Sequence, residues 1–199
     1  MTHFDTTMTR RLVALAVLGA ATAGMASCST GEDTDPAEAD PTEVGTVSGA
    51  VELPDGAWTA ATSAAGRCEQ ATPQLIAGTI ATVSGYDPDY SDEVGRQGYA
   101  ALAPVQWDTF GTGDAEQRSD LTAATDAVAA QLCEGFAAAG RIDPDADAAT
   151  AEELALSVVL FGERYTTEYG VTPVGEENDP HMQRAHITDI QNATASVSA

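Results

Sequence analysis

The chain of 199 residues is long enough for one domain with flanking segments. Its formal net charge is −23, and all eight of its basic residues are arginine, so nucleic acid and anionic lipid headgroups are poor partners for its surface. Hydrophobic residues make up 43% of the chain and many of them are alanine, which predicts a mainly α-helical domain with a core of small side chains.

The N-terminal segment has the pattern of an export signal. Arg10 and Arg11 precede an apolar run over residues 12–23, which is too short for a permanent membrane span. The sequence Met25-Ala26-Ser27-Cys28 follows and is similar to a bacterial lipobox. We therefore predict a lipoprotein signal peptide over residues 1–27 and a lipid anchor on Cys28, at the outer face of the cytoplasmic membrane. The alternative is an ordinary signal peptide with an incidental cysteine, and the export route stays open.

Residues 28–50 are rich in Asp, Glu, Thr, Pro and Gly and show no hydrophobic periodicity. Their like charges repel one another and their composition supplies no core, so we predict a disordered acidic tether. The folded domain is expected over residues 51–190.

Signals for helices begin shortly after the tether. A short helix is expected after Pro54, ending at Gly66. The pair Thr72-Pro73 suits an N-cap and a first helical position, and Gly85 suits the end of the same helix. The apolar face of that helix consists of Leu75, Ile76, Ile80 and Val83. Pro104 is expected to open another short helix.

Three further helices are predicted in the second half of the chain. The first spans residues 120–139 and is ended by Gly140. The second begins at a capping box formed by Thr150 and Glu153 and runs to Phe161. The third spans residues 181–190, and residues 191–199 are expected to form a frayed polar tail.

No metal or cofactor is expected. Asp143, Asp145 and Asp147 imitate the start of an EF-hand loop, but Ala148 stands where the loop needs glycine, which favours a solvated acidic loop. His181 and His186 are five residues apart, so one helix face does not align them as metal ligands. The sequence has no nucleophile elbow, P-loop or dinucleotide-binding fingerprint.

Cysteine usage predicts one disulfide. If Cys28 carries the lipid, Cys68 and Cys133 remain in an exported domain, where two leftover cysteines usually pair. We therefore predict that Cys68 and Cys133 are joined.

Two motifs point to a family. Ser84-Gly85-Tyr86-Asp87-Pro88 is followed by a second motif, a Gly-x-x-Gly segment with a downstream proline and tryptophan. The residues of this second motif are Gly95, Gly98, Tyr99, Pro104 and Trp107. In order and spacing they resemble the soluble lytic transglycosylases, and the lead-in from Trp58 to Ile76 looks like that of actinobacterial secreted members. The resemblance implies a lysozyme-like helical fold and an association with peptidoglycan glycan strands.

The polar positions of the catalytic groove in this family are apolar here. Val83 stands at the position of the catalytic glutamate, and Ala101 at that of a groove glutamine. The family's Ala-Tyr-Asn-Ala-Gly motif falls on residues 158–162, so that Val159 and Leu160 replace its tyrosine and asparagine. A lytic transglycosylase needs one carboxyl group to protonate the glycosidic oxygen, and valine has none. The groove-lining positions that the resemblance implies are Ser84, Tyr86, Tyr99, Ala101, Val159, Leu160 and Tyr165.

Four carboxylates lie near the first motif. Asp87 is expected to cap its turn, whereas Asp89, Asp92 or Glu93 would have to fold inward to replace the missing acid. We therefore expect a membrane-anchored, catalytically degenerate lytic-transglycosylase-like protein that binds glycan strands or a cell-wall protein. The alternative is an active murein lytic transglycosylase that uses a displaced carboxylate.

Overall fold

The computed structural model describes residues 51–171 and 182–197. The chain divides into two units, Met1–Pro41 and Thr42–Ala199, and all described residues belong to the second. The predicted signal peptide (1–27), the lipidation site Cys28 and the tether (28–50) lie outside the described residues, as does His181. Among the described residues, no helix has the length and apolarity needed to cross a membrane.

The described part is mainly helical, as the composition predicts. Its α-helices are α1 (Ala57–Ala64), α2 (Pro73–Ser84), α3 (Pro104–Phe110), α4 (Leu121–Ile142), α5 (Ala148–Phe161), α6 (Glu163–Tyr169) and α7 (Gln183–Ser196). Two short 3₁₀ helices, η1 (Ala65–Arg67) and η2 (Ala115–Ser119), follow α1 and precede α4. Within residues 51–171 and 182–197, extended pairing is limited to isolated bridges of Gln97 with Ser91 and Leu102.

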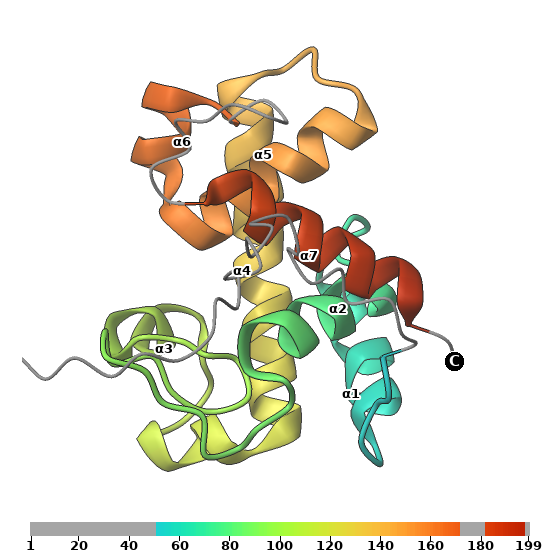
Figure 1. The fold of residues 1–199 in the computed structure, drawn as a ribbon, viewed down its shortest axis with the longest axis vertical. Coiled ribbons are helices and arrows are strands. Elements are labelled where there is room, and N and C mark those ends of the chain that lie inside the picture. The colour runs from blue at the N-terminus through green and yellow to red at the C-terminus, as the bar shows by residue number, and fades with distance from the viewer. Residues whose placement is uncertain (1–50, 172–181, 198–199) are drawn as a thin grey trace, which may run out of the picture. The chain divides into compact units, whose positions relative to one another are not determined.

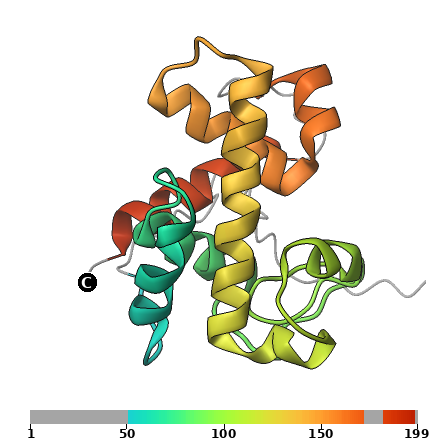
Figure 2. The same cartoon turned by 180° about the vertical axis from the view of Figure 1, so that it is seen from behind.

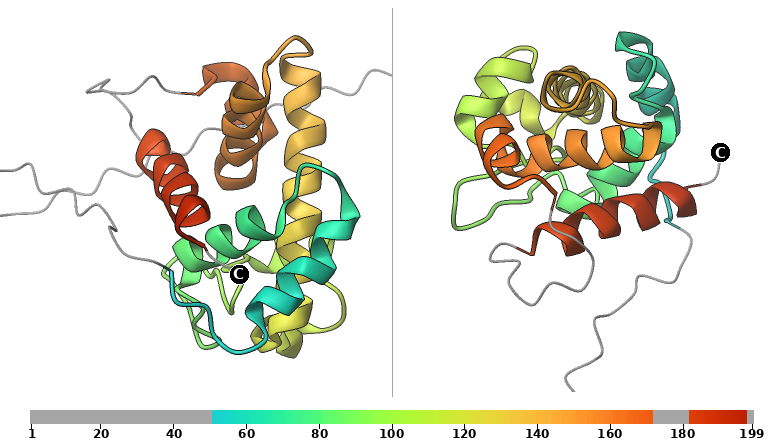
Figure 3. Two further views of the ribbon diagram at one scale, coloured as in Figure 1. Left: turned by 90° about the vertical axis from the view of Figure 1, so that its right-hand side faces the viewer. Right: turned by 90° about the horizontal axis from the view of Figure 1, so that it is seen from above.

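Helix α4 is the element against which the others pack. It contacts α1, α2, α3 and α5, and Figure 2 shows α1 on one side of it and the segment that contains α3 on the other. A view along α4 shows the same arrangement from its end (Figure 3). Its buried residues include Ala124, Ala127, Ala129 and Ala138, which let the neighbouring helices approach closely. The core is therefore built largely from small side chains, with Trp107, Ile76 and Leu132 among its largest members.

Helix α2 begins and ends where the local signals predict. The Thr72 hydroxyl accepts a hydrogen bond from the backbone N–H of Leu75 at 3.2 Å, and Pro73 occupies the first turn. Gly85 ends the helix in the left-handed conformation, with φ of 64°, which glycine adopts without steric cost. The apolar face of α2 is buried at Leu75, Ile76 and Ile80.

The predicted end of α4 at Gly140 is wrong. The helix continues to Ile142, and Gly140 does not have the positive φ that ends a helix. Arg141, in the last turn, forms ion pairs with Glu134 and with Glu163 of α6. A glycine ends a helix only where the chain turns left-handed, and here packing carries the helix through it.

The predicted start of α5 at a Thr150 capping box is also wrong. The helix begins at Ala148, because the carboxylate of Asp147 accepts a hydrogen bond from the backbone N–H of Thr150 at 2.8 Å. Glu153 does not turn back to the helix start, since its carboxylate binds Arg184 of α7 at 2.6 Å. An aspartate three residues before the expected N-cap Thr150 thus takes the N-cap position.

The predicted polar tail from residue 191 is helical in the structure. Helix α7 continues to Ser196, and Ile187, Ile190, Ala193 and Val197 are buried. These residues recur at helical spacing and pack against α2, which lies beside α7 in Figure 1. The small and polar residues between them hide this pattern in the sequence.

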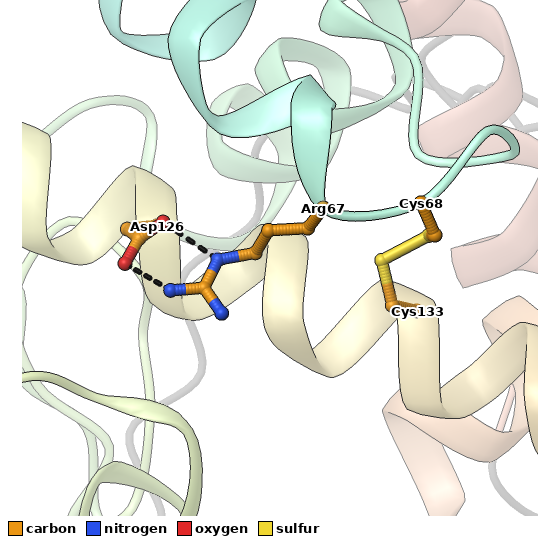
Figure 4. The surroundings of a disulfide bond; sticks show 4 residues. All are labelled: Arg67, Cys68, Asp126 and Cys133. Carbon is orange, nitrogen blue, oxygen red and sulfur yellow. Dashed lines mark hydrogen bonds and ion pairs between the residues drawn. A yellow bond between two sulfur atoms is a disulfide. The ribbon is translucent and has the colours of Figure 1, made fainter.

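The predicted disulfide between Cys68 and Cys133 is confirmed, with Cα atoms 5.9 Å apart. Cys68 lies just after η1 and Cys133 lies within α4 (Figure 4). The neighbouring residue, Arg67, pairs with Asp126, which is two turns before Cys133 on the same helix. Two adjacent residues therefore fasten the segment after α1 to one face of α4.

Replacement of Asp120 tests the N-cap of α4. Its carboxylate accepts a hydrogen bond from the backbone N–H of Ala123 at 2.8 Å. We expect Asp120→Ala to lower the free energy of unfolding by about 1 kcal/mol, measured by urea denaturation, because one helix donor loses its partner. Asp120→Asn retains an acceptor and is expected to stay within about 0.5 kcal/mol of the wild type. Equal losses in the two variants would contradict the capping role.

Candidate functional site

Three cavities adjoin along one groove. The groove lies between the C-terminal ends of α2 and α5, the loop that precedes α3, and helices α4 and α7. The first, of about 560 Å³, is lined by Val83, Arg96, Leu160 and residues of α7. The second, of about 50 Å³, shares Val83, Arg96 and Leu160 with it. The third, of about 400 Å³, shares Leu160 with both. We refer to these three cavities together as the groove.

The four positions at which the family's polar groove residues are missing lie together. Val83, Ala101, Val159 and Leu160 all line the small middle cavity, although they come from α2, the loop before α3, and α5. Val83 is half-buried at the last turn of α2. Ala101 is buried with a φ of 46°, held by a hydrogen bond from its N–H to the carbonyl of Gly98. The structure thus brings these four apolar side chains to one point of the groove.

The other predicted groove residues have different places. Ser84 is buried, and its hydroxyl lies 2.6 Å from the carbonyl oxygen of Tyr99, which ties α2 to the loop. The Tyr86 hydroxyl donates to the carbonyl of Ala77, and burial raises the pKa of Tyr86 to about 12. Tyr165 stacks on Phe161, with ring centroids 5.5 Å apart. Ser84, Tyr86, Tyr99 and Tyr165 do not line any of the three cavities.

Several groove residues were not predicted from the sequence. Arg96 lines two of the cavities, His186 of α7 lines the first, and Gln106 and Gln131 line the other two. Gln131 is buried in α4 and donates to the carbonyl of Val159 at 3.3 Å. The sequence signal for Gln131 was that a polar residue stands at a position whose helical spacing places it among the buried residues of α4. His186 and Arg96 reach the groove only through packing of distant segments.

Among the described residues, carboxylates line the third cavity only, at Glu134 and Glu163. Both pair with Arg141, at 2.9 Å in each case. Hydrogen bonds from Arg141 hold the pKa of Glu163 below its ordinary value, so this side chain is ionised at neutral pH. An ionised carboxylate has no proton to give a leaving group, which makes Glu163 unsuited to act as a general acid.

The carboxylates near the first motif are also engaged. Asp87 accepts a hydrogen bond from the backbone N–H of Asp89 at 2.9 Å and caps its turn, as predicted. Desolvation of Asp92 favours its neutral form, but hydrogen bonds from Arg96 and Val94 outweigh this effect and keep the pKa of Asp92 low. Asp89, Asp92 and Glu93 do not line any of the three cavities.

The arrangement suits contact with a ligand better than acid–base chemistry. At Val83 the groove offers apolar side chains, the guanidinium of Arg96 and amide groups, and none of the described residues that line the two cavities there carries a carboxyl group. The three cavities give this surface the concave form and apolar lining typical of binding sites. The chain matches no protein-family model, no curated protein and no solved structure.

Proposed function

We propose that the chain is an exported, lipid-anchored protein of the cell envelope, whose lysozyme-like helical domain binds a ligand in the groove without cleaving it. The observation that carries this proposal is the cluster of Val83, Ala101, Val159 and Leu160 around the middle cavity. These are the positions at which the resemblance to lytic transglycosylases places the polar groups of the reaction. Their meeting in space supports a degenerate active site in which shape is kept and chemistry is lost.

The engaged carboxylates support the same proposal. A displaced acid would have to reach the bond to be cleaved while it carries a proton. Glu163 lines the groove, but the hydrogen bonds from Arg141 favour its ionised form. Asp92 is held in a hydrogen-bonded turn by Arg96 and Val94. Candidate ligands of such a domain are peptidoglycan glycan strands or a cell-wall protein.

The proposal is tested by incubating the full chain with purified peptidoglycan. We expect no release of anhydro-muropeptides above background, measured by chromatography and mass spectrometry, because loss of a general acid costs about two to four orders of magnitude in rate. An active lytic transglycosylase run in parallel controls for the quality of the substrate. Anhydro products from the wild type would establish the alternative, an enzyme that uses a displaced carboxylate.

The variant Val83→Glu sharpens this test. Val83 is half-buried and lines two cavities together with Arg96, so a glutamate at this position has room and a cationic neighbour. Such a neighbour favours the ionised carboxylate, and we therefore expect Val83→Glu to fold and to remain inactive. Activity in Val83→Glu would show that a single substitution restores catalysis. That result would contradict the proposal that several catalytic positions of the groove have been lost.

A further inference from the structure

The groove is lined by apolar side chains that are exposed to different degrees. In its first cavity Ile190 is buried, Val83, Leu160 and Phe161 are half-buried, and Val94 is exposed at the rim. Val94 is 74% exposed, which makes it the most exposed of the large hydrophobic side chains in the described part of the chain. Apolar surface gathered in a concave site with a polar rim is typical of a contact site for another molecule. The ligand of this groove therefore has apolar groups of its own.

The negative net charge of the domain favours a positively charged ligand. Residues 51–199 contain 24 acidic side chains and six arginines. Four of these arginines are in ion pairs, so their charges are already compensated within the domain: Arg67, Arg96, Arg141 and Arg184. A field of this sign attracts cations and repels anions.

The charged groups at the groove differ between its two ends. Arg96, on the wall of the first cavity, is paired with Asp92. At the third cavity, Arg141 faces two carboxylates, Glu134 and Glu163, all three being about half exposed. The exposed Glu93 precedes the rim residue Val94 in the sequence. Carboxylates thus outnumber cations among the described lining residues of the third cavity, whereas at the first cavity the nearest carboxylates, Asp92 and Glu93, lie beside the lining residues Arg96 and Val94.

An aromatic row continues from the groove along α6. Phe161 lines the first and third cavities and stacks on Tyr165, which stacks on Tyr169 with ring centroids 4.9 Å apart. Tyr169 is 64% exposed, and a hydrogen bond with Glu168 raises the pKa of the Tyr169 hydroxyl. An exposed aromatic ring beside a carboxylate is a favourable contact for a guanidinium or ammonium group.

We propose that the groove is a docking site for a segment of a partner protein in which apolar and basic side chains alternate. The apolar side chains occupy the cavities at Val94 and Leu160, and the basic ones meet Glu93, Glu163 and the aromatic row. A glycan strand supplies no cation for these carboxylates. This inference rests on the proposed non-catalytic binding role and specifies its ligand as a polypeptide.

The test uses fluorescent peptides and the purified full chain in fluorescence anisotropy titrations. One peptide alternates leucine with arginine, the second alternates leucine with glutamate, and the third alternates serine with arginine. We expect the leucine–arginine peptide to bind at least about tenfold more tightly than either of the others, because only it satisfies both the apolar and the charge requirements. Added salt should weaken its binding.

Two matched pairs of variants locate the site. Val94→Ser removes an apolar rim residue of the first cavity, whereas Val105→Ser changes a valine of α3 that is 70% exposed and lines none of the three cavities. We expect Val94→Ser to weaken the affinity for the leucine–arginine peptide by at least about threefold and Val105→Ser to leave this affinity unchanged. Glu163→Gln should weaken binding in the same way, while Glu69→Gln, which removes an exposed carboxylate outside the groove, should not.

Three outcomes overturn this inference. Equal binding of the serine–arginine peptide would show attraction by net charge alone. Equal effects of the variants in each pair would place the peptide elsewhere. Binding of purified glycan strands that Val94→Ser weakens, without peptide binding, would assign the groove to a glycan and leave the proposed non-catalytic function intact. Release of anhydro-muropeptides would instead overturn that proposed function, which separates the two failures.

Discussion

Replacing Cys68 and Cys133 together by alanine is expected to lower the free energy of unfolding by about 4 kcal/mol. The two cysteines are 65 residues apart in the sequence, and their bond restricts the unfolded chain over that whole loop. A loss of this size is a sizeable part of the roughly 5–15 kcal/mol by which a domain is stable. The measurement is urea denaturation of the wild type and of Cys68→Ala/Cys133→Ala under oxidising conditions.

Reduction provides the control for this prediction. A reductant should shift the denaturation midpoint of the wild type toward that of the double variant and leave the double variant itself unchanged. Arg67→Ala removes the neighbouring ion pair with Asp126, which is partly exposed, and is expected to cost no more than about 1 kcal/mol. A wild-type midpoint that does not respond to reductant would contradict a stabilising role for the disulfide.

Gly78→Ala is expected to destabilise the domain by about 2 kcal/mol. A Cβ atom at Gly78 would lie 2.6 Å from the backbone nitrogen and 2.8 Å from the Cα atom of Thr194 in α7. Because backbone atoms must move to relieve this overlap, α2 and α7 would separate at a cost of about 3 kcal/mol. The better helix propensity of alanine returns about 1 kcal/mol of that cost.

Gly140→Ala is the matched control, since it makes the same substitution within α4. A Cβ atom there meets no other atom within 4 Å, and the φ of Gly140 is not positive. We expect Gly140→Ala to stabilise the domain by about 1 kcal/mol through helix propensity alone. The changes in the free energy of unfolding, measured by thermal or urea denaturation, should therefore have opposite signs in the two variants. Destabilisation by both would show that glycine is needed for a reason other than space.

Features of the fold that depend on neighbouring residues could be predicted from the sequence. The start of α2 at Thr72-Pro73 and its end at Gly85 follow from hydrogen bonds and backbone conformation within a few residues. The pairing of Cys68 with Cys133 could be predicted from the small number of cysteines and from the expectation that the chain is exported. The start of α5 was missed because both Asp147 and Thr150 have side chains that can cap a helix. Asp147 occupies the N-cap position, and Glu153, which a capping box at Thr150 would need, binds Arg184 of α7.

The groove could be predicted only in part. The family resemblance pointed to Val83, Ala101, Val159 and Leu160, and the structure places all four around one cavity. Arg96 was missed, because nothing near it in the sequence indicates that its side chain lies beside Val83. Tyr86 and Tyr99 were expected in the groove, but both instead pack against the core, since the loop between α2 and α3 folds back on α2.

By itself, the sequence determined that the chain is acidic and that the domain is mainly helical, and it predicted the pairing of Cys68 with Cys133. These properties depend on composition and on interactions between near neighbours. The tertiary structure alone decided that α4 runs through Gly140 and that α7 extends to Ser196, because packing across the domain overrides local preference. It also decided which charges reach the groove, since the burial of α7 on α2 at Gly78 sets the position of His186, and the loop before α3 brings Arg96 to Val83.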